Sequence, residues 1–166
     1  MATLLSMPVT AALGAKSKDE TRTRYARTLW ALLGLFVARV LGQVLVAFAN
    51  VRFLPPMSEW YSGLLPYPIL LPVQCAIIAL FSSICVDISR GFGTFAWANE
   101  RIGAFLVWFS GVYFVSMVAR YLITMTVHPE RRWFGGTIPI FFHFVLAAYL
   151  FVLSRYHSTF GKLAEA

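Results

Sequence analysis

Four apolar segments, each long enough to cross a lipid bilayer, constrain the fold of this chain more than any other feature. They cover residues 29–51, 69–86, 102–127 and 137–154. A membrane-spanning helix needs about 20 predominantly apolar residues. None of the segments shows the alternation of polar and apolar residues that marks a barrel strand. The sequence therefore predicts an all-α integral membrane protein, folded as a bundle of four transmembrane helices.

The overall composition supports this fold class. Apolar residues make up 59% of the chain and charged residues 13%, whereas soluble domains average about 45–50% and about 25%. We expect three parts: a basic N-terminal tail over 1–28, a transmembrane domain over 29–156 and a short C-terminal tail over 157–166. The predicted helices cover about 29–51, 69–88, 102–127 and 137–155, and the sequence RGFG at 90–93 predicts the end of the second one.

The distribution of lysine and arginine predicts the orientation. Five lie in the N-terminal tail, two in the connection after the second segment and two after the fourth, whereas the opposite connections hold three. Cytoplasmic loops are enriched in such residues. We therefore expect a multi-pass protein of the cell inner membrane with both termini in the cytoplasm, in contact with membrane lipids. The cations are split among short tails and loops, so the sequence gives no support for nucleic-acid binding.

Two pairs of similar strings suggest an internal repeat. The sequence V-A-R-x-L occurs at 37–41 and at 118–122, and each copy is followed by a related string that ends in proline, WYSGLLP at 60–66 and WFGGTIP at 133–139. Two parallel helix hairpins, related by an axis along the membrane normal, would explain this order. Coincidence in a sequence of low diversity is the alternative.

Arg39 places a permanent charge near the centre of the first segment. At a rise of 1.5 Å per residue it lies about 15 Å from either end of that segment, where an arginine costs about 2.5–3.5 kcal/mol. All seven acidic residues lie in tails, connections or at membrane boundaries. Partners within the chain would be Gln43, Gln74, Ser116, a carbonyl freed by Pro72, or water. Partners outside it would be a lipid phosphate, a ligand carboxylate or an acid of another subunit.

A stripe of small residues accompanies this arginine. Gly34, Ala38 and Gly42 recur every four residues, a spacing that allows close approach of helices in lipid. Arg39 and Gln43 lie beside the stripe, so we expect both to point into the bundle.

A larger polar group is predicted in the outer half of the membrane. It is a candidate site for a ligand or a partner, and its alternative is a set of separately satisfied packing residues. Its members are Arg39, Gln43, Gln74, Arg120, Tyr121 and His143.

The histidines and cysteines narrow the cofactor chemistry. Cys75 and Cys85 lie about 15 Å apart on one helix, too far for a disulfide. His143 and His157 are spaced as on the two-haem helices of b-type cytochromes, but no second helix carries the opposite histidines. No metal site is predicted, and a haem or quinone shared with another subunit remains open.

Enzymatic function is not expected, because the chain has no carboxylate pair, no Ser-His-Asp set, no metal cluster and no nucleotide loop. Two interpretations remain. The first is a non-catalytic helical subunit, or an assembly and stabilising partner, of a larger membrane protein complex. The alternative is a membrane protein that binds an amphipathic anion, such as a lipid headgroup, a quinone or a haem propionate, in the outer-half group.

Overall fold

The computed structural model describes residues 9–49, 51, 53–54, 60, 66–127 and 137–165. Within these ranges the chain is all-helical and contains no strand. The helices are α1 (Val9–Ala49), α3 (Tyr67–Arg90), α4 (Glu100–Val127) and α5 (Thr137–Glu165). Each of the four is long and apolar enough to cross a membrane, which fits a multi-pass membrane protein.

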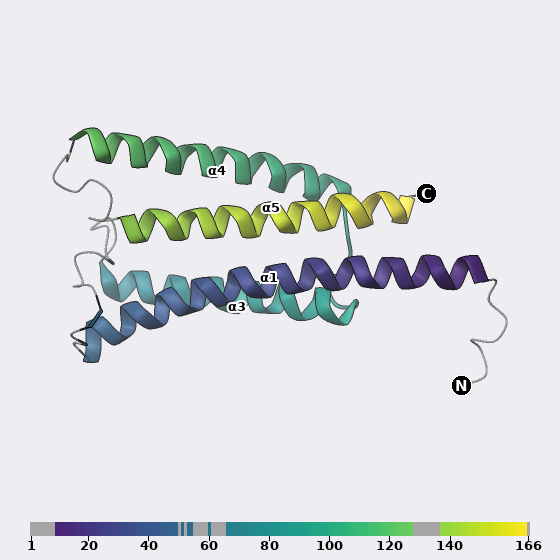
Figure 1. Cartoon of the computed structure of the whole chain (residues 1–166), viewed down its shortest axis with the longest axis horizontal. Helices are drawn as coiled ribbons and strands as arrows, with labels where there is room; N and C mark the ends of the chain where they lie inside the picture. The colour runs from purple at the N-terminus through teal and green to yellow at the C-terminus, as the bar shows by residue number, and fades with distance from the viewer. Residues whose placement is uncertain are drawn as a thin grey trace.

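Helix α1 is much longer than the apolar segment that it contains. It has 41 residues and a length of about 60 Å, twice the thickness of the hydrocarbon core. The stretch 9–28, expected from sequence as a tail, forms the first half of this helix. In Figure 1 it extends past the ends of the other helices, on the same side of the bundle as the end of α5.

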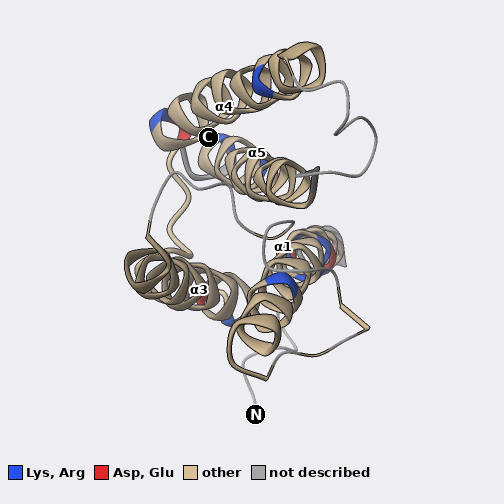
Figure 2. Ribbon diagram, turned by 90° about the vertical axis from the view of Figure 1, so that its left-hand side faces the viewer, with Lys and Arg blue, Asp and Glu red and all other residues tan. Residues whose placement is uncertain are grey.

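The four helices are arranged so that α5 and α1 occupy the middle. Contacts between elements join α4 to α5, α5 to α1, and α1 to α3. Figure 2 shows the same order from the end of the bundle, with α4 beside α5 and α3 beside α1. Among the described residues, α4 therefore has one neighbouring helix, while the other three share the core.

The apolar core lies between α1, α3 and α5. The ring of Tyr149 stacks on Phe81 with centroids 3.8 Å apart, and its hydroxyl donates to the Phe81 carbonyl at 3.0 Å. The Tyr149 hydroxyl oxygen also lies 3.4 Å from Cys85 Sγ. The buried members of this core are Ala26, Leu29, Leu33, Phe81, Ile84, Cys85, Ile88, Tyr149, Leu153, Tyr156 and Phe160.

The connection between α3 and α4 is held by polar contacts. Gly91 ends α3 in the left-handed conformation, with φ 76°, and its N–H donates to the Asp87 carbonyl at 2.9 Å. This confirms the predicted helix end. The Asp87 carboxylate accepts from the Phe95 N–H at 3.1 Å. Asn99 then caps α4, because its Oδ1 accepts from the N–H groups of Arg101 and Ile102 at 2.9 and 3.3 Å.

Helices α4 and α5 approach most closely beside this connection. A Cβ atom on Gly103 would lie 2.7 Å from Ser158 Oγ and 3.1 Å from the Ser154 carbonyl, and one on Gly161 would lie 2.8 Å from the Glu100 nitrogen. The two glycines therefore let the backbones meet without a side chain between them. His157 Nδ1 accepts from the Asn99 N–H at 3.2 Å and ties α5 to the start of α4.

Candidate functional site

The buried charge of α1 lies in a polar cluster formed by Arg39, Gln43, Gln74 and the main-chain carbonyl of Trp60, here called the arginine–glutamine cluster. Arg39 Nη1 donates to Gln43 Oε1 at 3.3 Å, and Nη2 donates to the Trp60 carbonyl at 3.2 Å. Gln74 Nε2 donates to the same Gln43 oxygen at 3.1 Å. Gln43 Nε2 reaches the Trp60 carbonyl at 3.5 Å.

The local sequence explains how these groups meet. Arg39 and Gln43 are one turn apart on α1, so their side chains lie on the same face. Gln74 faces them from α3. Gly42 leaves room for the Trp60 ring, because a Cβ atom at this position would lie 2.6 Å from that ring. The small residue therefore leaves room for Trp60, whose carbonyl accepts from the arginine.

The cluster is shielded from its surroundings. Gln43 is 0% exposed, Gln74 4% and Arg39 8%. The Arg39 guanidinium carbon lies 5.5 Å from the centre of the Phe142 ring, so α5 contributes an aromatic face to the charge. Two buried atoms, Arg39 Nε and Gln74 Oε1, have no hydrogen-bond partner within the described part of the chain.

Arg39 therefore points into the bundle and finds its main partners inside the chain. Of the internal candidates, Gln43 binds it directly, and Gln74 acts one bond away through the Gln43 oxygen. Ser116 is exposed on α4 and donates to the carbonyl of Val112 at 2.8 Å. No acidic side chain forms an ion pair with Arg39 among the residues that the structure describes. The Trp60 carbonyl was not expected, because the sequence does not reveal how the connection folds.

The remaining predicted residues do not join this cluster through hydrogen bonds. His143 on α5 pairs with Tyr113 on α4, Nδ1 to phenol oxygen, with the rings edge to face at 5.8 Å. Arg120 and Tyr121 are half-buried on α4, and neither side chain has a hydrogen bond to the described residues. Sequence reasoning missed Tyr113, although it lies seven residues before Arg120, on the same helix face.

The stripe of small residues has a different role from the one expected. A Cβ atom on Gly34 would meet no atom within 4 Å, and Ala38 is exposed. Gly42 alone has a close neighbour, and this neighbour is the ring of Trp60, which lies in the chain between α1 and α3. The stripe therefore does not mediate close packing between the described helices.

The thiols and metal ligands offer no second site. Cys75 is exposed and Cys85 is buried against Tyr149, so they lie on different faces of α3. Within the described ranges, no three residues of His, Cys, Asp or Glu come together in a way that could hold a metal ion.

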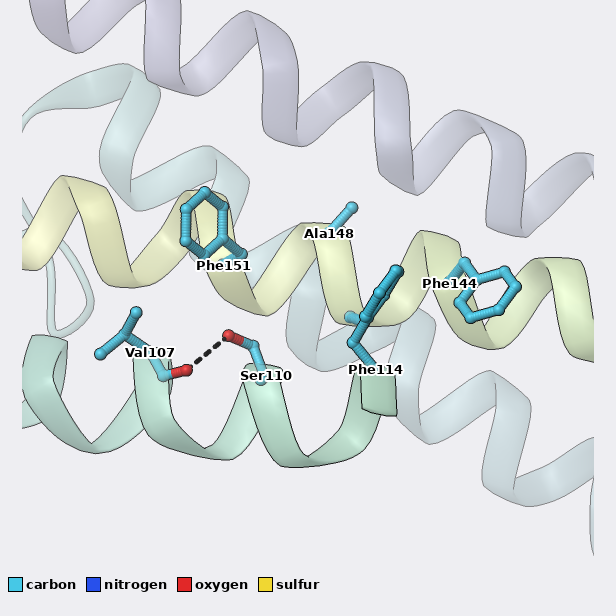
Figure 3. A pocket seen from close by; sticks show the side chains of 8 residues that line it. Val107, Ser110, Phe114, Phe144, Ala148 and Phe151 are labelled. Atoms are coloured by element: carbon cyan, nitrogen blue, oxygen red, sulfur yellow. Dashed lines mark hydrogen bonds between the residues drawn. The ribbon is translucent and has the colours of Figure 1, made fainter. Parts of the chain in front are cut away.

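Helix α4 borders a groove that begins at its contact with α5. A concavity of about 420 Å³ lies between α4 and α5. Figure 3 shows three phenylalanines and Val107 around it, with the Ser110 hydroxyl turned back toward the Val107 carbonyl, to which it donates at 3.0 Å. Its lining residues are Val107, Ser110, Gly111, Phe114, Phe144, Ala147, Ala148 and Phe151. A second concavity of about 460 Å³ lies along α4 from Val107 to Ser116 and shares Val107 and Gly111 with the first. We call the two together the Gly111 groove.

Comparison with known proteins gives no further assignment: no family model, no curated protein and no solved structure matches this chain.

Proposed function

We propose that this protein is a non-catalytic subunit, or an assembly and stabilising partner, of a larger membrane protein complex. The observation that carries the proposal is the position of α4. In its most apolar stretch only 11% of the residues are buried, compared with 39% in α5 and 33% in α1. Lipid can cover such a surface, but a helix that has one neighbouring helix and a groove along its surface also suits a partner helix.

The occupant that we propose for the Gly111 groove is a transmembrane helix of another subunit. A glycine flanked by Val107 and Val115 lets a second backbone come close, and van der Waals packing at small residues drives helix association in lipid. The groove continues directly from the α4–α5 interface. Ser110 and Ser116 are satisfied within α4, so the partner need only supply apolar surface.

The charge of Arg39 is not a reason to expect a partner helix. An unpaired charge in the membrane would favour an acid from another subunit, but Gln43 and the Trp60 carbonyl occupy two guanidinium nitrogens. The partner surface is therefore better sought on α4 than beside α1.

The test is the native mass of the full chain extracted from its own membranes in a mild detergent. We expect a stoichiometric protein partner that is lost in Gly111→Phe, which fills the groove, and retained in Leu122→Phe. Leu122 is 57% exposed on the same helix and does not line the groove. Recovery of the wild-type chain with lipid alone, with a second copy of itself alone, or with a partner that ignores Gly111→Phe would contradict the proposal.

The alternative function, binding of an amphipathic anion, rests on one atom. Arg39 Nε is a buried donor without a partner among the described residues, and a lipid phosphate, a quinone oxygen or a haem propionate could accept from it. Such a ligand would have to reach the guanidinium of Arg39, a residue that is 8% exposed. Extraction of the purified protein with organic solvent, followed by absorption spectra and mass spectrometry, would detect a bound molecule that Arg39→Leu loses.

The orientation and the repeat complete the proposal. The described ends of the chain lie at the same end of the bundle (Figure 1), and we propose that this end faces the cytoplasm of a cell with an inner membrane. Tags at both termini would then report cytoplasm, and a reporter at Glu130, which lies outside the described residues, would report the opposite side. We also propose that the α1–α3 and α4–α5 hairpins arose by duplication. An experimental structure in which the two hairpins superpose, with Trp60 over Trp133, would support this.

A further inference from the structure

Another cavity, separate from the Gly111 groove and from Arg39, lies at the end of the bundle where both described chain ends are found. It has a volume of about 420 Å³ and lies between the first half of α1, the connection 91–99 and the last turns of α5. Lys18, Arg22 and Asp19 line it from α1, Trp97 from the connection and Phe160 from α5.

The two cations of this cavity are held in place. Lys18 Nζ lies 5.9 Å from the centre of the Phe160 ring. Arg22 forms an ion pair with Asp19, and its guanidinium packs on the backbone of Gly91, where a side chain would overlap it. Asp19 offsets one of the two charges, and the cavity keeps a net positive charge from Lys18.

The cavity lies near the expected depth of lipid headgroups. Arg22 precedes the apolar residue Leu29 by seven positions, or about 10 Å along α1. The headgroup layer extends about 5–8 Å beyond the hydrocarbon on each side, a distance that long cationic side chains can bridge. Trp97 is 80% exposed and Phe92 is 66% exposed in the same connection. Exposed tryptophan is typical of the membrane interface.

We propose that this cavity binds the headgroup phosphate of an anionic phospholipid. Lys18 and Arg22 would face the phosphate, and Trp97 would lie against the glycerol and the first acyl carbons. The proposal requires that the helices span a membrane, but it is independent of the subunit role and of Arg39. It concerns one bound lipid in a defined cavity, not general attraction to a charged surface.

The experiment uses the purified full chain in a mild detergent, with dioleoyl phosphatidylglycerol or dioleoyl phosphatidylcholine added, and counts bound lipids by native mass spectrometry. We expect one retained phosphatidylglycerol, and an occupancy about tenfold lower in the double variant Lys18→Gln/Arg22→Gln, since each basic residue contributes to the binding of anionic lipid. The matched control is Arg24→Gln/Arg27→Gln. Both of these residues are exposed on the same helix and lie outside the cavity.

A second pair of variants keeps all charges. Ala15 lines the cavity, whereas its neighbour Gly14 does not and has open space around it. Ala15→Leu should therefore lower the phosphatidylglycerol occupancy, and Gly14→Leu should leave it unchanged.

Three results would overturn the proposal. Equal losses in the two charge variants, or no loss in either, would mean diffuse attraction or no site. Equal retention of phosphatidylcholine would exclude selection for an anionic headgroup. Glycerol 3-phosphate that protects the lipid-free chain from heat as well as phosphatidylglycerol does would assign the cavity to a soluble phosphate.

Discussion

Replacing Arg39 by leucine tests how the buried charge is accommodated. The two hydrogen bonds of Arg39, at 3.3 and 3.2 Å, lie at the long end of the usual N–H···O distances. Hydrogen bonds to a charged group contribute about 1.5–3 kcal/mol each. The Phe142 face adds about 0.5–2 kcal/mol. The opposing contributions are about 2.5–3.5 kcal/mol for an arginine at the centre of a membrane helix and about 1–3 kcal/mol for Nε, which has no partner among the described residues. The favourable and opposing contributions nearly cancel.

We therefore expect Arg39→Leu to change the free energy of unfolding by no more than about 1 kcal/mol in either direction, since replacing buried charged groups by apolar residues of similar size is often neutral or stabilising. No new unpaired group appears in this variant. The Gln43 oxygen keeps its bond from Gln74, and the Trp60 carbonyl keeps the Gln43 amide at 3.5 Å.

Gln43→Leu supplies the contrast within the same cluster. It removes the oxygen that accepts from both Arg39 and Gln74. Two buried donors lose their partner, at about 1–3 kcal/mol each. The neutral residue should therefore be more important for stability than the charged one, with a loss of at least about 2 kcal/mol.

The assay is reversible unfolding of the purified chain in micelles by sodium dodecyl sulfate, followed by circular dichroism. Arg39→Lys serves as a control, because lysine keeps the charge but loses the planar fork. A loss larger in Arg39→Leu than in Gln43→Leu would refute the reasoning. It would mean that the guanidinium binds a molecule outside the chain, and the alternative anion-binding function would then gain support.

Three further predictions concern other parts of the bundle. Gly103→Leu should destabilise the protein by about 1–3 kcal/mol in the same assay, because the side chain would enter the α4–α5 backbone contact; Gly111→Leu, with nothing within 4 Å of its Cβ, should be neutral, and similar losses in both would contradict the close contact. Asn99→Ala should lower the free energy of unfolding by about 1 kcal/mol, because it removes the cap of α4. The melting temperature should fall accordingly, and an unchanged one would argue against that cap. N-ethylmaleimide should modify Cys75 in the folded protein and Cys85 only after unfolding, as mass spectrometry would show; early modification of Cys85 would contradict its burial.

The four long helices of the described residues could be predicted because the lengths of the apolar segments alone set their number and type. A bilayer leaves the backbone no partner but itself, so a long apolar segment must be helical. The start of α1 was less evident, since its first half is polar. Its alanine, lysine and arginine residues favour helix, and Tyr25 then packs edge to face on Tyr156, a contact that depends on the tertiary arrangement.

The candidate site was predictable only where neighbours in sequence are neighbours in space. Arg39 and Gln43 share a face because they are one turn apart. The partner Trp60 lies 21 residues from Arg39, and nothing local indicates where the main chain of a connection will lie. The pairing of Tyr113 with His143 depends on how α4 is rotated about its axis, and a helix that is apolar on all sides does not specify that rotation.

The shared position of α5 has a consequence for biosynthesis. Helix α5 is the last of the four in sequence, yet it is the one described helix that α4 contacts, and its Tyr149 stacks on Phe81 of α3. If the four helices insert into a membrane as we propose, the nascent chain can pair α1 with α3 as soon as both are inserted, but α4 must wait in the lipid until α5 emerges. Arrival of α5 then completes two interfaces at once, so a ribosome stalled just before it would leave a half-built bundle that quality-control proteases can recognise.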